Sequence, residues 1–213
     1  MKTTPTAPAA EIVARAPRSA PGEADDPQGW QQASLGEIMD QAVSRYHSRL
    51  HQDLPHIARL AERVASADAA RYPEIVEIAR ICSMLRSAIE EHTEKEERLL
   101  FPLIRQLARG TSDARSPLAT LAPAVEAMTR EHDTVVAALA QLDKLTGGFE
   151  APAGTDNVVR SLYHQLAELK RGLQKHMLIE DQVLFPRALE LEASLLAARA
   201  ERERRPKGRR PTR

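Results

Sequence analysis

Two stretches of the sequence carry the same arrangement of residues with ligand chemistry. Residues 92–102 read HTEKEERLLFP and residues 176–186 read HMLIEDQVLFP. In each stretch a His is followed four residues later by a Glu, then by a second acid, and Leu-Phe-Pro closes the string. Imidazole nitrogens and carboxylate oxygens are ligands for transition metals, and residues four apart share one face of a helix. The repeat therefore predicts two halves of one metal centre.

The segments that would carry these residues have the period of amphipathic helices, with almost no alternating β-branched runs. We expect four long helices over about residues 34–66, 73–108, 123–145 and 156–199. Pro55 should kink or split the first helix, and Pro102 should disturb the second. Helices of this length with short connections favour an all-α, up-down-up-down four-helix bundle.

Local signals place the helix ends. Ser34-Leu35-Gly36-Glu37 reads as a capping box. Pro73 is suited to a first helical turn, and Gly147-Gly148 reads as a stop. Thr155 or Asp156 can cap the last helix.

Each expected helix places one His on an apolar stripe that would face the bundle interior. Helices two and four add a Glu to the same stripes, four residues after the His. The spacing also repeats, because 45 residues separate His47 from His92 and 44 separate His132 from His176. The candidate metal ligands are His47, His92, Glu96, His132, His176 and Glu180. Apolar neighbours expected on these stripes include Ile89, Leu99 and Leu103 around His92, and Val135, Val136 and Leu139 around His132.

Two buried carboxylates need a cation. Burying an unpaired carboxylate costs on the order of several kcal/mol, and the nearby Lys and Arg residues do not share the inward stripes. If Glu96 and Glu180 each bridge, two ions would each receive two His nitrogens and two carboxylate oxygens. An oxo or hydroxo bridge and an exogenous ligand would still fit. In a four-helix bundle this ligand set favours two iron ions.

Several neighbouring residues receive weaker predictions. Glu97 and Asp181 follow the predicted ligands directly and are expected to face solvent, with support of a ligand or control of access to the site as the less favoured alternative. His51 could contact a ligand from outside the centre or pack beside Pro55, and the sequence leaves both open. Tyr46 could line the site or cap the core. His164 is expected on a solvent face.

Composition limits the remaining possibilities. The net charge is zero, which gives no argument for nucleic acid or for an anionic membrane. No apolar run reaches the roughly 18 residues of a membrane span, and no secretory signal is evident, so we expect a cytoplasmic protein. The single Cys82 is expected to be a buried, inert thiol. We divide the chain into a disordered Pro/Ala-rich segment (1–33), the bundle (34–200) and a basic disordered tail (201–213).

The complete motif order resembles the hemerythrin HHE cation-binding family. The stretches SLGEIMDQAVSRYHSRLHQDLPHI, EEHTEKEERLLFPLI, TREHDTVVAAL and KHMLIEDQVLFPRAL are further similar to the bacterial di-iron iron-sulfur cluster repair proteins, the RIC family. The resemblance implies a hemerythrin-like bundle with an oxo- or hydroxo-bridged di-iron centre. Its ligands would fall on His47, His92, His132 and His176, with Glu96 and Glu180 as bridges.

The resemblance also implies function. The protein would act in the nitrosative and oxidative stress response, supplying iron to damaged iron-sulfur proteins, binding and reducing nitric oxide, or both. The alternative is a protein that binds or senses oxygen, nitric oxide or iron without turnover, so enzymatic activity stays open. Met128 and Val136 stand where oxygen carriers supply a His pair on the third helix, which argues against oxygen carriage. The family's N-terminal domain with adjacent cysteines is not expected, because the sequence has a single Cys.

Overall fold

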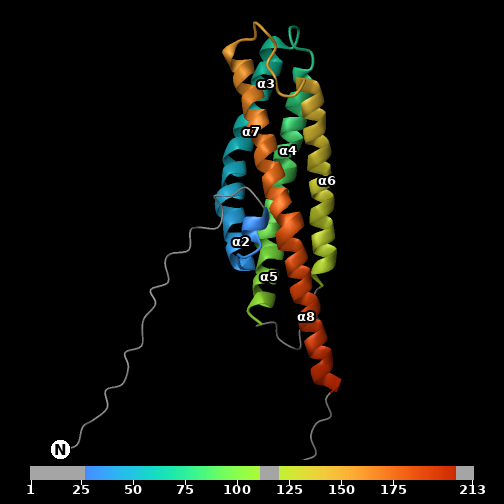
Figure 1. Cartoon of the computed structure of the whole chain (residues 1–213). Helices are drawn as coiled ribbons and strands as arrows, with labels where there is room; N and C mark the ends of the chain where they lie inside the picture. Colours follow the sequence, from blue (N-terminus) through green and yellow to red (C-terminus); the bar gives the residue numbers. More distant parts are fainter. Residues whose placement is uncertain (1–26, 111–119, 205–213) are drawn as a thin grey trace, which may run out of the picture.

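The described part of the chain is a bundle of four long helical rods. The computed structural model describes residues 27–110 and 120–204, and successive rods run in opposite directions (Figure 1). A short helix, α1 (Pro27–Trp30), precedes them. No strand occurs among the described residues, and the predicted all-α four-helix bundle is confirmed. The rods are α2 (Leu35–Gln41), η1 (Ala42–His47) and α3 (Ser48–Asp68); α4 (Ile75–Lys95), η2 (Glu96–Leu100) and α5 (Phe101–Ala108); α6 (Leu121–Thr146); and α7 (Asn157–Ile179), η3 (Glu180–Leu184) and α8 (Phe185–Arg204).

The predicted end signals act as expected. Ser34 Oγ accepts from the Glu37 amide at 3.2 Å, and Glu37 Oε2 accepts from the Ser34 amide at 2.8 Å, which completes the capping box. Asp156 Oδ1 accepts from two first-turn amides of α7, both at 2.9 Å. Gly147 ends α6 with a φ of 60°, a left-handed conformation that glycine adopts without a steric penalty.

The two prolines expected to disturb the helices do not break them. Pro55 lies inside α3, which continues through it, so of the predicted kink or split the split does not occur. The irregularity in the second rod lies at η2, which ends two residues before Pro102, and Pro102 lies in the first turn of α5.

The N-terminal boundary also differs from the prediction. Residues 27–33, placed in a disordered segment, begin with α1, and the Trp30 side chain is only 1 % exposed. Arg187 holds this segment, because its Nη1 donates to the carbonyls of Trp30 at 3.3 Å and Ala33 at 2.7 Å. Burial of one large aromatic side chain stabilises the turn that Pro27 begins. The other residues predicted to be disordered, 1–26 and 205–213, lie outside the described residues, and α8 continues to Arg204.

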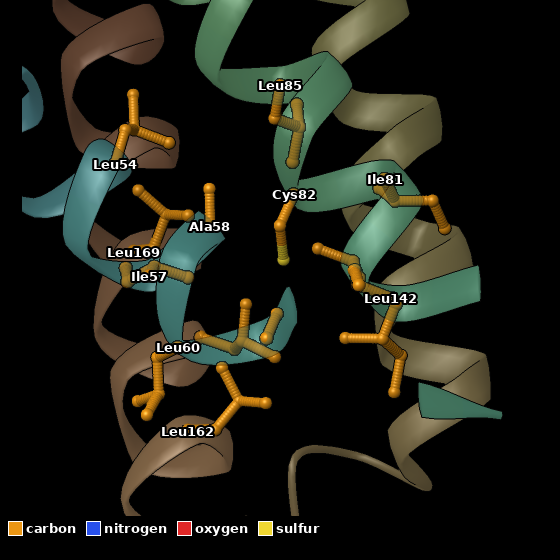
Figure 2. Packing of buried hydrophobic residues seen from close by; sticks show 14 of the residues in the cluster. Leu54, Ile57, Ala58, Leu60, Ile81, Cys82, Leu85, Leu142, Leu162 and Leu169 are labelled. Atoms are coloured by element: carbon orange, nitrogen blue, oxygen red, sulfur yellow. The ribbon is translucent and has the colours of Figure 1, made fainter. Parts of the chain in front are cut away.

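The core consists of two apolar clusters with a polar layer between them. One cluster joins α3, α4, α6 and α7, and Figure 2 shows Leu54, Cys82 and Leu169 packed within it. The other joins α1, α2, α5, α8 and the near ends of α6 and α7, and it includes Trp30 and Phe185. Along each rod the sequence passes from one cluster to the other close to a predicted ligand. No described helix combines the length and the apolar character needed to cross a membrane.

Candidate metal centre

The polar layer consists of the six residues predicted as ligands. Each rod contributes one His, and η2 and η3 each begin with a Glu. None of the six is more than 3 % exposed, so the layer is closed to bulk solvent. The structure thus brings together His47, His92, Glu96, His132, His176 and Glu180, and their donor atoms form two groups of candidate ligands.

The four rings form two pairs, and each pair combines one ring from each helical hairpin. His47 Nε2 lies 3.1 Å from His176 Nε2, and His92 Nε2 lies 3.2 Å from His132 Nε2. Two nitrogens at about 2.1 Å from one ion and at right angles would lie about 3.0 Å apart. Each pair therefore has the spacing of two ligands on one ion. Neither repeated string alone would hold an ion, because His92 of the first string pairs with His132, and His176 of the second string pairs with His47.

Each Glu contacts one ring of each pair. Glu96 Oε2 lies 3.3 Å from His47 Nε2 and 3.4 Å from His92 Nε2. Glu180 Oε1 lies 2.8 Å from His176 Nε2, and its Oε2 lies 3.3 Å from His132 Nε2. Both carboxylates therefore stand where they would bridge two ions.

Three of the four carboxylate oxygens in the layer lack the partners that buried charges need. Neither oxygen of Glu96 nor Oε2 of Glu180 has a hydrogen-bond partner among the described residues. Burial and the charge of Glu180 raise the pKa of Glu96. Burial alone would raise the pKa of Glu180 as well, but His176 and His132 bring it well below its ordinary value. Metal cations would neutralise both carboxylates, so the residues present fit a metal site.

Acids outside the layer hold three of the rings. Glu97 Oε1 lies 2.8 Å from His47 Nδ1, and Asp181 Oδ1 lies 2.9 Å from His132 Nδ1. Glu97 and Asp181 are exposed, as expected, and they also support the ligands, which was the less favoured alternative. A ring that donates from Nδ1 keeps Nε2 free to bind metal. Burial lowers the pKa of His132, but Asp181 and the buried Glu180 together raise it to about 10.

The third outer acid, Glu131, was missed in the sequence. Its Oε2 lies 2.8 Å from His92 Nδ1, and its Oε1 accepts from Lys95 Nζ at 2.7 Å. Burial raises the pKa of Glu131, but Lys95 and His92 bring it below its ordinary value. The available signal was an acid directly adjacent to His132, in the way that Glu97 and Asp181 adjoin the two Glu ligands.

Aromatic rings support the histidines. Phe101 stacks on His47 at 5.9 Å between centroids, and Phe185 stacks on His132 at the same distance. These are the Phe residues of the repeated Leu-Phe-Pro strings. Tyr46 stacks on His176 at 5.4 Å, so it lines the site.

Two residues predicted to face the core, Leu99 and Val136, are exposed, and a wider helical turn explains the first. The amide of Phe101 donates to the carbonyl of Glu96 and that of Phe185 to Glu180, so η2 and η3 each hold one extra residue per turn. This shift buries Leu100 and leaves Leu99, predicted inward, 69 % exposed. Val136 is also 51 % exposed, because the buried stripe of α6 is narrow.

The remaining histidines lie outside the layer. His51 Nε2 lies 2.8 Å from Thr93 Oγ1, beside His92 in the chain, and His51 itself is exposed. His51 was predicted either to contact a ligand from outside the centre or to pack beside Pro55. It contacts Thr93, the neighbour of a ligand in the chain, and no ligand directly. His164 is exposed, as expected.

A four-helix bundle with a buried layer of four His and two Glu defines a class of metal-binding proteins. Comparison with known sequences places this chain in the same class. Residues 39–188 and 123–205 match the hemerythrin HHE cation binding domain. The iron-sulfur cluster repair protein DnrN of Neisseria gonorrhoeae is 33% identical over 162 residues, which is 76% of this chain and 96% of DnrN. The iron-sulfur cluster repair protein YtfE of Enterobacter sp. (strain 638) is 34% identical over 75% of this chain and 69% of YtfE. This chain belongs to the hemerythrin HHE family, within the group that contains the iron-sulfur cluster repair proteins.

Proposed function

We propose that the polar layer holds two iron ions and that the protein repairs damaged iron-sulfur clusters in the cytoplasm during nitrosative and oxidative stress. One ion would lie between His47 and His176 and the other between His92 and His132, with Glu96 and Glu180 bridging them. The observation that carries the proposal is that each Glu reaches one His of each pair with otherwise unsatisfied oxygens.

The residues of the layer are suited to bind iron in either of its common oxidation states. Histidine and carboxylate ligands bind both ferrous and ferric ions, and a bound iron pair supplies one-electron chemistry. Glu97, Glu131 and Asp181 fix the ring orientation through Nδ1 and increase the basicity of Nε2. Phe101 and Phe185 stack on rings and keep water away.

Iron is also the cargo of the proposed repair. A carboxylate that meets the two His pairs through separate oxygens could release one ion while still holding the other, so Glu180 would control release. The names of DnrN and YtfE support this role, because both are called iron-sulfur cluster repair proteins. Damaged iron-sulfur proteins would then be the partners of this chain.

Metal analysis followed by a transfer assay tests the proposal. Protein purified without oxygen is expected to contain two iron atoms per chain and to show oxo-to-iron charge-transfer absorption after exposure to air. Mixed with a dehydratase whose [4Fe–4S] cluster has lost one iron, it should restore dehydratase activity. A matched sample stripped with chelator should not. Stoichiometric zinc, or equal recovery with the stripped sample, would contradict the proposal.

A second candidate function uses the site for nitric oxide or oxygen. The observation that favours it is the enclosure of the layer, since ligand residues that are at most 3 % exposed leave access only to small molecules. Addition of nitric oxide to the reduced protein under anaerobic conditions separates the possibilities. Nitrous oxide over several turnovers indicates a reductase, whereas a single stoichiometric adduct indicates a binder or sensor.

A further inference from the structure

The Nδ1 atoms of the four His rings, which point away from the centre of the layer, do not all have the same kind of partner. Both rings of one pair donate from Nδ1 to a carboxylate, His92 to Glu131 at 2.8 Å and His132 to Asp181 at 2.9 Å. Lys95 Nζ holds the other oxygen of Glu131 at 2.7 Å. This pair therefore has a carboxylate behind each nitrogen ligand.

The other pair has one such carboxylate. His47 donates to Glu97 at 2.8 Å. Across residues 27–110 and 120–204, no carboxylate oxygen lies within hydrogen-bond distance of Nδ1 of His176, whose ring instead stacks on Tyr46 at 5.4 Å. An imidazole that donates to a carboxylate is the stronger metal ligand.

The difference arises at one equivalent position of the repeat. Tyr46 directly precedes His47 in the first hairpin, and Glu131 directly precedes His132 in the second. Each contacts the other ring of the same pair, Tyr46 by stacking on His176 and Glu131 through a carboxylate oxygen on His92. The bundle is thus nearly two-fold symmetric in its ligands but not in the groups behind them.

We propose that the two metal positions differ in strength: the ion between His92 and His132 is retained, and the ion between His47 and His176 is exchanged. Glu131 is the positioning residue that creates most of the difference. The bridges Glu96 and Glu180 are shared by both positions and do not separate them. This inference rests on the proposed two-ion site.

Chelator kinetics test the inference directly. Protein loaded anaerobically with two ferrous ions is mixed with excess ferrous chelator, and coloured complex is followed over time. Two phases of one ion each are expected. Bound iron should quench the fluorescence of Trp30, the single tryptophan of the sequence. This fluorescence should recover mainly in the fast phase, because Trp30 lines the crevice that borders His176 and Glu180.

Three variants assign the phases. Glu131→Gln and Asp181→Asn should each accelerate the slow phase by about 10- to 100-fold and leave the fast phase unchanged. Glu97→Gln should accelerate only the fast phase. Because two independent variants act on the slow phase, failure of one to fold leaves the other informative.

Glu91→Gln is the matched control. Glu91 pairs with the same Lys95 at 2.8 Å but contacts no His of the layer, so both phases should keep their rates. Two ions that leave wild-type protein at one rate would overturn this inference and leave the two-ion site intact. Binding of fewer than two ions would overturn both. An effect of Glu91→Gln equal to that of Glu131→Gln would show that Glu131 does not act through His92.

Discussion

At the scale of single residues, two acidic residues next to each other in the chain have different roles at the site. Glu96 and Glu180 are fully buried and point their oxygens at Nε2 atoms. Glu97 and Asp181, the next residues, are partly exposed and accept from Nδ1 atoms. Consecutive residues on a helical rod face different directions, so Glu96 and Glu97 contact the two nitrogens of the His47 ring from opposite sides. Glu180 and Asp181 do the same at His132.

The buried acids should be indispensable for metal binding. Glu180→Gln keeps the shape of the side chain but removes the charge that bridges the two His pairs, so bound iron is expected to fall from two to less than one per chain. Elemental analysis of anaerobically purified protein measures this loss. Glu190→Gln, on an exposed position of the following helix, serves as control and should keep two ions. Two iron atoms in the Glu180 variant would refute the bridging assignment.

The buried thiol of Cys82 gives a prediction about pH. Burial raises its pKa to about 12, and the thiolate is the reactive form. Alkylation of the folded protein by iodoacetamide should therefore be slow at pH 8 and should accelerate about tenfold per pH unit up to pH 11. Mass spectrometry follows the modified fraction, with urea-unfolded protein as the reference. A rate that levels off near pH 9 would contradict the raised pKa.

At the scale of helices, the rods depend on contacts from distant parts of the chain. Thr120 makes no side-chain cap for α6. Instead Glu192 of α8, only 6 % exposed, accepts from the amide of Leu121 at 2.7 Å. A carboxylate at a helix N-terminus satisfies a free amide and interacts favourably with the helix dipole. The fourth rod thus fixes the start of the third.

Loss of this contact should weaken the bundle. Glu192→Ala is expected to lower the free energy of unfolding by about 1–2 kcal/mol, because it leaves a buried amide without a partner. Urea titration of metal-free protein, followed by circular dichroism, measures the change. Glu190→Ala, an exposed neighbour, should change stability by less than about 0.5 kcal/mol. Equal effects of the two substitutions would show that the cap contributes nothing.

At the scale of the whole molecule, the polar layer interrupts the core. Apolar clusters lie on both sides of it, and every rod crosses it at a His. Without metal, two carboxylates with unsatisfied oxygens sit between these clusters. With metal, the same residues would tie all four rods together at mid-length.

Metal should therefore stabilise the entire bundle. Ferrous ion at about 100 times its dissociation constant adds about 2.7 kcal/mol, which corresponds to a rise of roughly 5–10 °C in the unfolding midpoint for a chain of this size. Anaerobic thermal melts with and without iron measure the rise, and excess chelator should reverse it. Calcium, which prefers oxygen ligands, should leave the midpoint unchanged. Equal midpoints with and without iron would contradict a metal that joins the rods.

The sequence alone determined the features that depend on local spacing. A His and a Glu four residues apart share a helical face wherever the helix lies, so the composition of the polar layer followed from the pattern. The capping box and the Asp156 cap likewise involve residues within one turn. The apolar period predicted the bundle, since four amphipathic helices bury their stripes most simply against one another.

Only the tertiary structure decided how separate rods meet. The pairing of His47 with His176, the contact of Glu131 with His92, and the cap from Glu192 all join distant segments. They depend on the rotation and height of one rod against its neighbours, which no single-helix pattern contains. The wide turns at Glu96 and Glu180 were also not predictable from helical period, because each shifts the residues that follow it by one position. The turn at Glu96 leaves Leu99 exposed. Helical period fixes which residues share a face, whereas packing between rods fixes what each face meets.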